Sequence, residues 1–190
     1  MNLSIIVPCH RVHIKYIKNI IIGNISKQTL KPDEMIIVIN PITNSYQNQI
    51  INYVFEELKK DYSSVKFIEI EEECTPGKAR NIGFNNSNGD IIIYSDADDL
   101  YHPMRNEIVT RVFKDHNCDV VLHDYLLKEK DFLSKKIEYE SILIDRCVID
   151  SDHETNMKPG DNNFKIVHGH ASFKRGALKD GSNSKNFPMC

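Results

Sequence analysis

The chain up to about residue 125 alternates between two hydrophobic patterns. Short apolar runs are typical of buried strands, and they occur at residues 3–7, 34–39, 65–70, 91–95 and 119–122. Between them, apolar residues recur every three or four positions, which predicts helices over 12–30 and 46–60, and from Pro76 and His102 onward. Strands that alternate with helices predict an α/β fold, in which a mostly parallel sheet is flanked by helices on both faces.

The pattern weakens after Tyr125. Residues 131–144 are compatible with a strand or a hairpin arm, and the polar stretch 150–163 is typical of a loop. A last strand is expected at 164–167 and a short helix at 171–178. The length of 190 residues favours a single domain.

Composition places the chain among ordinary globular proteins, with 41% hydrophobic residues, 27% charged residues and a net charge of −3. This balance argues against a nucleic-acid partner. No apolar run approaches the length of a bilayer span, so no integral membrane segment is expected. Widely spaced cysteines without a CxxC pair favour reduced thiols, hence a cytoplasmic protein or a domain of a larger one. They are Cys9, Cys74, Cys118, Cys147 and Cys190.

Three carboxylates follow the strand expected at 91–95, in the sequence Asp96-Ala97-Asp98-Asp99. Like charges this close repel one another unless a cation neutralises them or water solvates them. Side chains two residues apart on an extended backbone point the same way, so Asp96 and Asp98 face one ligand while Asp99 turns aside. Carboxylate oxygens suit Mg²⁺ or Mn²⁺, which are commonly shared with a phosphate. The sequence therefore predicts a divalent-metal site that holds a phosphorylated substrate.

Other polar segments also follow expected strands, at residues 8–11, 40 and 75–78. The carboxyl ends of parallel strands meet at one edge of a sheet, where α/β proteins bind ligands. Gly77, Lys78 and Arg80 stand near a helix start, where free N–H groups and positive side chains favour an anion. The pattern predicts a diphosphate that bridges this helix start and a metal at Asp98. The alternative is that Lys78 and Arg80 are solvated surface residues.

Three blocks of sequence together resemble the inverting family 2 glycosyltransferases of GT-A fold. They are VPCHR, TPGKARNIGFNNSNGDIIIYSDADD and HGHASFKRGAL. The resemblance implies one GT-A-like (Rossmann-like) domain over residues 1–190, with a nucleotide-sugar-binding half at 1–125 and an acceptor-side half at 126–190. It also implies sugar transfer with inversion from a UDP-sugar to a hydroxyl of a glycan, lipid or protein acceptor, with Mn²⁺ or Mg²⁺ as cofactor.

The resemblance further implies roles for single residues. Pro8 lines the base pocket, Asn40 stands where the family has an aspartate that contacts uracil, and Arg80 lies near the base or diphosphate. Asp96 hydrogen-bonds the ribose, and Asp98, with Asp96 as a second candidate, ligates the metal. The full set expected at the nucleotide sugar is Pro8, His10, Asn40, Gly77, Lys78, Arg80, Asp96, Ala97 and Asp98.

Asp99 is expected either to lie close to the sugar or to orient its neighbours. On the acceptor side, Phe173-Lys174-Arg175 resembles the family's late F-x-R element. The family places an acidic pair after that element, and one member acts as the catalytic base. This chain has no clear counterpart, which leaves His170 and Asp180 as candidates. His168 is a candidate third metal ligand, and the alternative is that His168 and His170 are hydrogen-bonded structural residues.

Two departures from the family pattern are visible. The second strand ends in Asn40-Pro41 where the family commonly reads Asp-Asp-Gly-Ser, which leaves the choice of nucleotide base open. Arg11 replaces an asparagine that is common after the first strand of the family.

Two other functions stay open. The first is a phosphohydrolase, because a strand followed by D-x-D also marks these enzymes, although they usually carry it on the first strand. The second is a non-catalytic domain that binds a nucleotide sugar but lacks a catalytic base.

Overall fold

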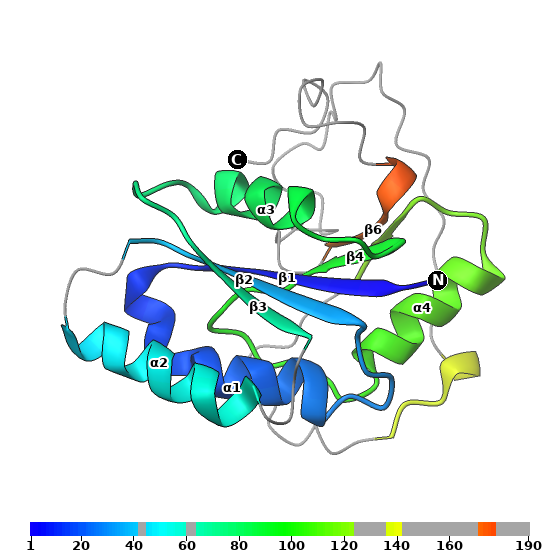
Figure 1. Ribbon diagram of the computed structural model, residues 1–190. Helices are drawn as coiled ribbons and strands as arrows, with labels where there is room; N and C mark the ends of the chain where they lie inside the picture. Colours follow the sequence, from blue (N-terminus) through cyan, green and yellow to red (C-terminus); the bar gives the residue numbers. More distant parts are fainter. Residues whose placement is uncertain (42–44, 60–63, 124–135, 142–170, 178–190) are drawn as a thin grey trace, which may run out of the picture.

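The computed structural model describes residues 1–41, 45–59, 64–123, 136–141 and 171–177. These residues form a six-stranded sheet in the order β3-β2-β1-β4-β6-β5 (Figure 1). The strands are β1 (Leu3–Cys9), β2 (Glu34–Ile39), β3 (Val65–Glu69), β4 (Ile91–Tyr94), β5 (Val120–Leu122) and β6 (Ala171–Lys174). β1 is parallel to β2 and β4, and β2 is parallel to β3, whereas β6 is antiparallel to both β4 and β5. The expected α/β fold with a mostly parallel sheet is confirmed.

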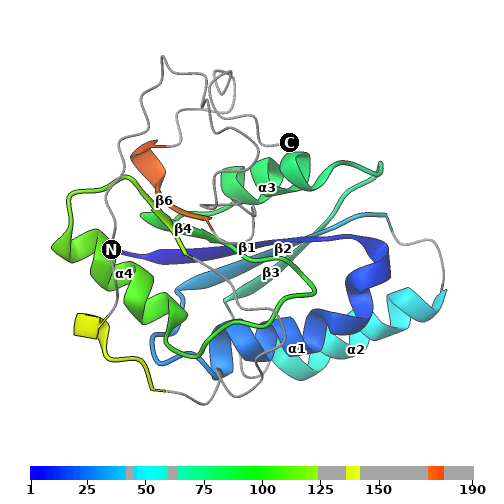
Figure 2. The ribbon, with the colours of Figure 1, turned by 180° about the vertical axis from the view of Figure 1, so that it is seen from behind.

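Helices cover both faces of this sheet (Figures 1 and 2). The helix α3 (Pro76–Asn85) packs on one face, and α1 (Ile17–Ile21), α2 (Ser45–Lys59) and α4 (Arg105–Asp115) pack on the other. Every residue of β1 and β2 is buried, because both faces of these central strands are covered. Within the described ranges, no helix is both long and apolar enough to cross a bilayer.

The segment predicted as one helix over 12–30 consists of three consecutive helical segments of different type. It begins as the 3-10 helix η1 (Arg11–Tyr16), continues as α1, and ends as the π-helix η2 (Ile22–Ser26). The buried Asn24 side chain donates to the carbonyl of Ile20 at 3.0 Å, which competes with the regular backbone bond. The isoleucine stripe is core, as expected: Ile14, Ile17, Ile21 and Ile25 are all buried.

Pro8 does not end the first strand, although the sequence suggested that it would. β1 continues to Cys9, and Pro8 pairs with Val38 of β2. The carbonyl of Ile6 accepts from Ser95 on the β4 side, and Pro8, two residues later, points the same way. β4 has already ended there, so the missing N–H of Pro8 costs no sheet hydrogen bond.

The prediction of a helix over 171–178 is wrong. Residues 171–174 form β6, and only Arg175–Ala177 turn as a 3-10 helix. Short apolar runs do not distinguish a strand from a helix by periodicity, and here β4 and β5 offer backbone partners on both sides. Residues 139–141 form a 3-10 helix within the stretch read as a strand or hairpin arm. The expected loop at 150–163 and strand at 164–167 lie outside the described residues.

Gly83 sets how closely α3 approaches the sheet. A Cβ at this position would lie 2.4 Å from Ile6 Cγ2 and 3.3 Å from Val38 Cγ2. Gly83→Ala therefore forces α3 away from β1, and we expect a loss of about 2 kcal/mol in the free energy of unfolding, as for other overpacked cores. In a domain of this size, that corresponds to a fall of about 4–8 °C in the melting temperature, measured by circular dichroism.

Gly23→Ala is the matched control, because a Cβ added there would meet nothing within 4 Å. We expect that variant to melt at the same temperature or slightly higher, since alanine restricts the unfolded chain. Equal melting temperatures for the two variants would contradict the close approach of α3.

Candidate functional site

A cleft of about 300 Å³ opens at the carboxyl edge of the parallel strands. Seven of the nine residues expected at a nucleotide sugar line it, and they are Pro8, His10, Asn40, Arg80, Asp96, Ala97 and Asp98. Lys78 lines a shallow depression beside the cleft together with Glu73, Cys74 and Thr75. Gly77 is buried in the first turn of α3 and lines neither. The convergence of strand ends expected from the sequence is therefore present in the fold.

The sequence reasoning missed six further lining residues, which are Cys9, His13, Val38, Cys74, Pro76 and Ala79. His13 belongs to the helix predicted over 12–30, and only the fold brings it opposite Asp98. Two of these residues, Cys9 and Cys74, carry thiols. Burial raises the pKa of Cys9 to about 12, and the charge of Asp98 adds to this effect. Cys9 is therefore protonated and unreactive at neutral pH.

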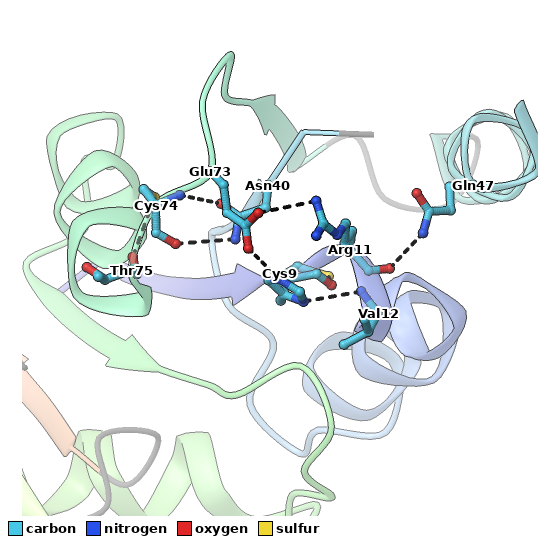
Figure 3. A network of polar contacts seen from close by, with 9 residues as sticks. Cys9, Arg11, Val12, Asn40, Gln47, Glu73, Cys74 and Thr75 are labelled. Atoms are coloured by element: carbon cyan, nitrogen blue, oxygen red, sulfur yellow. Dashed lines mark hydrogen bonds and ion pairs between the residues drawn. The ribbon is translucent and has the colours of Figure 1, made fainter. Parts of the chain in front are cut away.

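One wall of the cleft is a polar network that joins the loop after β1 to the segment before α3 (Figure 3). His10 Nε2 lies 3.0 Å from Glu73 Oε1, and Arg11 lies 3.2 Å from Glu73 Oε2. The hydrogen bond from His10 and the charge of Arg11 lower the pKa of Glu73. The segment before α3 is thus tied to the end of β1.

Asn40 belongs to the same wall (Figure 3). Its Nδ2 donates to the carbonyl of Cys74 at 3.3 Å, and its Oδ1 accepts from the Cys74 N–H at 3.2 Å. The amide of Asn40 therefore fastens the end of β2 to the chain that leads into α3. Each of its polar atoms keeps one further hydrogen-bonding position.

Arg80 holds the first carboxylate of the acidic segment. The Arg80 side chain is buried, and its guanidinium lies 2.6 Å from Asp96 Oδ1 and 5.7 Å from the centre of the Tyr94 ring. The hydroxyl of Tyr101 accepts from the N–H of Asp96 and donates to its carbonyl. Asp96 is consequently fixed in both backbone and side chain.

Arg105, on α4, supports the same segment from the other face of the sheet. It donates to Ser95 Oγ at 2.6 Å, to the carbonyl of Tyr94 at 2.6 Å and to His123 Nε2 at 3.0 Å. Its guanidinium lies 4.2 Å from the centre of the Tyr101 ring. Burial lowers the pKa of Arg105 to about 10, so the side chain stays charged at neutral pH. No sequence pattern marked this residue, although three clustered carboxylates imply buried positive charge nearby.

The acidic segment keeps an excess of negative charge despite these arginines. Burial raises the pKa of Asp99, and the charges of Asp96 and Asp98 raise it further. The Asp98 side chain is about half exposed and lines the cleft. An exposed carboxylate beside two others suits a hard divalent cation such as Mg²⁺ or Mn²⁺. In the described part of the chain, no three metal-binding side chains form a cage, so substrate oxygens and water would complete the coordination.

The helix start that was expected to bind an anion is well formed. Thr75 is the N-cap of α3, and its Oγ accepts from the N–H of Lys78 at 3.3 Å. Pro76 occupies the first turn, where its missing N–H costs nothing. The positive end of α3 and Lys78 therefore face the depression beside the cleft.

Arg175, from the element that resembles F-x-R, lies at the opposite edge of the sheet. Because β6 is antiparallel to β4, the chain leaves the cleft edge at Ala171 and reaches the amino edge at Lys174. Arg175 then donates to the carbonyl of Gly89 at 2.7 Å and to Ser87 Oγ at 2.6 Å. In this structure Arg175 fastens the turn before β4 and does not reach the cleft.

The candidate bases and the candidate third metal ligand lie outside the described residues. They are His170, Asp180 and His168. Their roles therefore stay predictions.

The mostly parallel sheet with helices on both faces is similar to the fold of GT-A glycosyltransferases. The family model for glycosyl transferase family 2 matches residues 4–181, and the chain belongs to this family. It is 29% identical over 109 residues to the UDP-Gal:α-D-GlcNAc-diphosphoundecaprenol β-1,3-galactosyltransferase of Escherichia coli, covering 57% of this chain and 38% of that protein.

Two solved structures of S. aureus TarS 1–349 share the fold. The complex with UDP-GlcNAc aligns with a TM-score of 0.62 and 19% identity, over 99% of this chain and 49% of TarS 1–349. The complex with UDP aligns with a TM-score of 0.61 and 20% identity, over 99% of this chain and 50% of TarS 1–349. The chain thus spans half or less of the length of these proteins.

Arg105 offers a test of how the acidic segment is supported. Arg105→Met removes the buried charge beside Asp96 and Asp99, and we expect the free energy of unfolding to fall by about 3 kcal/mol in urea titrations. Arg105→Lys keeps the charge but cannot match the planar set of donors, so its loss should be smaller, about 1–2 kcal/mol. Lys114→Met, at an exposed position of the same helix, is the control, with a change within about 0.5 kcal/mol. Equal stability of the Arg105 and Lys114 variants would refute the role given to Arg105.

Proposed function

We propose that this chain binds a nucleoside diphosphate sugar, UDP-sugar by preference, and transfers the sugar to an acceptor hydroxyl with inversion at the anomeric carbon. The observation that carries the proposal is the cleft itself, where the ends of β1, β2 and β4 and the start of α3 bring a recess, positive groups and carboxylates together. Membership of family 2 supports the reaction class. The names of the E. coli and S. aureus relatives support UDP as the nucleotide.

The nucleotide would lie along the wall formed by Pro8, Asn40 and Cys74. The remaining hydrogen-bonding positions of the Asn40 amide can donate and accept at a pyrimidine edge. Asp96, held by Arg80, is an oriented acceptor for a ribose hydroxyl. Because the pair is fixed before the ligand arrives, little conformational entropy is lost when the ribose binds.

The diphosphate would lie between Lys78 at the start of α3 and Asp98. Lys78 and the helix N-terminus supply positive charge where negative charge grows as the sugar departs. Asp98, with Asp96 as a second candidate, would hold Mn²⁺ or Mg²⁺, and a cation bound there would stabilise the leaving diphosphate without proton transfer. Asp99 lies next to these ligands, in position to orient them or to meet the sugar.

The acceptor hydroxyl must lose its proton as it attacks the face of the sugar opposite the diphosphate. A positioned base contributes roughly 10²–10⁴-fold to such a step. His170 and Asp180 are the candidates in this sequence. His170 directly precedes Ala171, where β6 begins at the cleft edge of β4, which makes His170 the first residue to replace.

Calorimetric titration of UDP, GDP and dTDP, each with and without Mn²⁺, tests the donor site. We expect UDP to bind most tightly and only with the metal present. Asp98→Ala should weaken metal-dependent UDP binding by about 100-fold or more, equivalent to roughly 2.7 kcal/mol. Its melting temperature should stay unchanged, because the Asp98 side chain is about half exposed.

Asp119→Ala is the matched control, since Asp119 is an exposed carboxylate at the amino end of β5. UDP binding should be unaffected in that variant. If Asp98→Ala binds UDP and Mn²⁺ as the unmodified chain does, the proposed donor site is wrong. Phosphate release from a simple phosphomonoester, without use of a sugar nucleotide, would instead favour a phosphohydrolase.

A further inference from the structure

His13 faces Asp98 across the cleft. His13 lies on η1, after β1, and its Nε2 is 3.8 Å from Asp98 Oδ2. The two side chains come from different strand ends, and both are partly exposed, with 33% and 51% of the side-chain area accessible. The pair therefore lies where the diphosphate and its cation are proposed to bind.

The 3.8 Å separation leaves the two side chains adjacent but without a direct hydrogen bond. It is longer than the ordinary limit of about 3.2 Å for a nitrogen–oxygen hydrogen bond. Both side chains are partly exposed, so a rotation of each would let Nε2 and Oδ2 bind one cation together.

The neighbouring rings orient His13. The ring of His10 packs edge-on at 6.3 Å between centroids, and the ring of Tyr16 packs at 6.2 Å. Of the two histidines that line the cleft, His10 is already engaged, because its Nδ1 accepts from the N–H of Val12 and its Nε2 contacts Glu73. His13 is the one that faces the acidic segment.

We propose that His13 is a nitrogen ligand of the cation held by Asp98 and that it makes the site prefer Mn²⁺ over Mg²⁺. The inference rests on the donor site proposed above and adds a ligand that precedes α1 instead of following β4. A neutral imidazole with its proton on Nδ1 presents the lone pair of Nε2 to the metal. Mn²⁺ accepts an imidazole nitrogen beside its oxygen ligands more readily than Mg²⁺, which keeps oxygen ligands and water, so a nitrogen ligand favours Mn²⁺ over Mg²⁺.

Pulsed electron paramagnetic resonance of Mn²⁺ bound to the full chain with UDP tests this directly. We expect a ¹⁴N coupling from a coordinated imidazole, absent in His13→Ala and in His13→Gln. Calorimetry with the same samples should show Mn²⁺ binding weakened about 10-fold or more in His13→Ala and Mg²⁺ binding changed less than about 2-fold. His13→Gln, which supplies an oxygen, should bind the two ions with more similar affinities.

His116→Ala is the matched control, because this histidine follows α4 and does not line the cleft. It should keep both the ¹⁴N coupling and the preference for Mn²⁺. Melting temperatures of all variants separate a lost ligand from a lost fold.

Each other outcome decides against the inference. Mn²⁺ that binds in an Asp98-dependent manner without ¹⁴N coupling would leave the donor site standing and reduce the His13–Asp98 contact to an ion pair. Coupling that persists in His13→Ala would assign the nitrogen to another residue. Equal weakening of Mn²⁺ and Mg²⁺ would remove the selectivity. Failure of the unmodified chain to bind Mn²⁺ and UDP would overturn the donor site and the His13 ligand together.

Discussion

Repulsion among Asp96, Asp98 and Asp99 is the constraint on which the candidate site depends. Two buried arginines reduce it from opposite layers of the fold. Arg80 arrives from α3 on one face of the sheet, and Arg105 arrives from α4 on the other. Two positive charges do not balance three carboxylates, and the pKa of Asp99 is raised first by burial and then by the charges of Asp96 and Asp98. The residual negative charge is what suits the cleft to a cation.

The packing of α3 and α4 on the sheet places these two arginines. Arg80 reaches Asp96 because α3 lies close against β1 at Gly83. Arg105 stands in the first turn of α4, where it meets the backbone of Tyr94 and the hydroxyl of Ser95 as β4 ends. The cleft therefore exists only when both layers are in place. A compact intermediate that lacked either helix would hold the acidic segment without its balancing charges.

The sequence predicted most of the fold because its elements are strongly periodic. The isoleucine-rich runs at β1, β2 and β4 and the stripe at 14–25 need no long-range information. The predictions that the first strand ends before Pro8 and that residues 171–178 form a helix are wrong, because these two regions depend on long-range contacts. Whether a proline or a short apolar run fits a strand depends on which neighbours are present, and those neighbours are distant in sequence.

Part of the site was predictable from the rule that ligands bind at the carboxyl ends of parallel strands. That rule placed Asn40, Arg80 and the carboxylates at one cleft. It could not find His13, because His13 meets Asp98 far along the chain, nor Arg105, because nothing in the spacing of its helix marks that position. The acceptor side expected for Arg175 came from the family resemblance, and the antiparallel direction of β6 carries this residue to the edge of the sheet opposite the cleft.

The position of β6 has a consequence for any attempt to divide the protein. Ala171–Lys174 come late in the sequence, yet they lie between β4 and β5 and bond to both. A shortened chain that stopped soon after β5 would keep every cleft residue named here but would leave the exposed flank of β4 without its neighbour. Bare strand flanks of this kind pair with other chains, so such a fragment would aggregate before its affinity for a nucleotide could be measured.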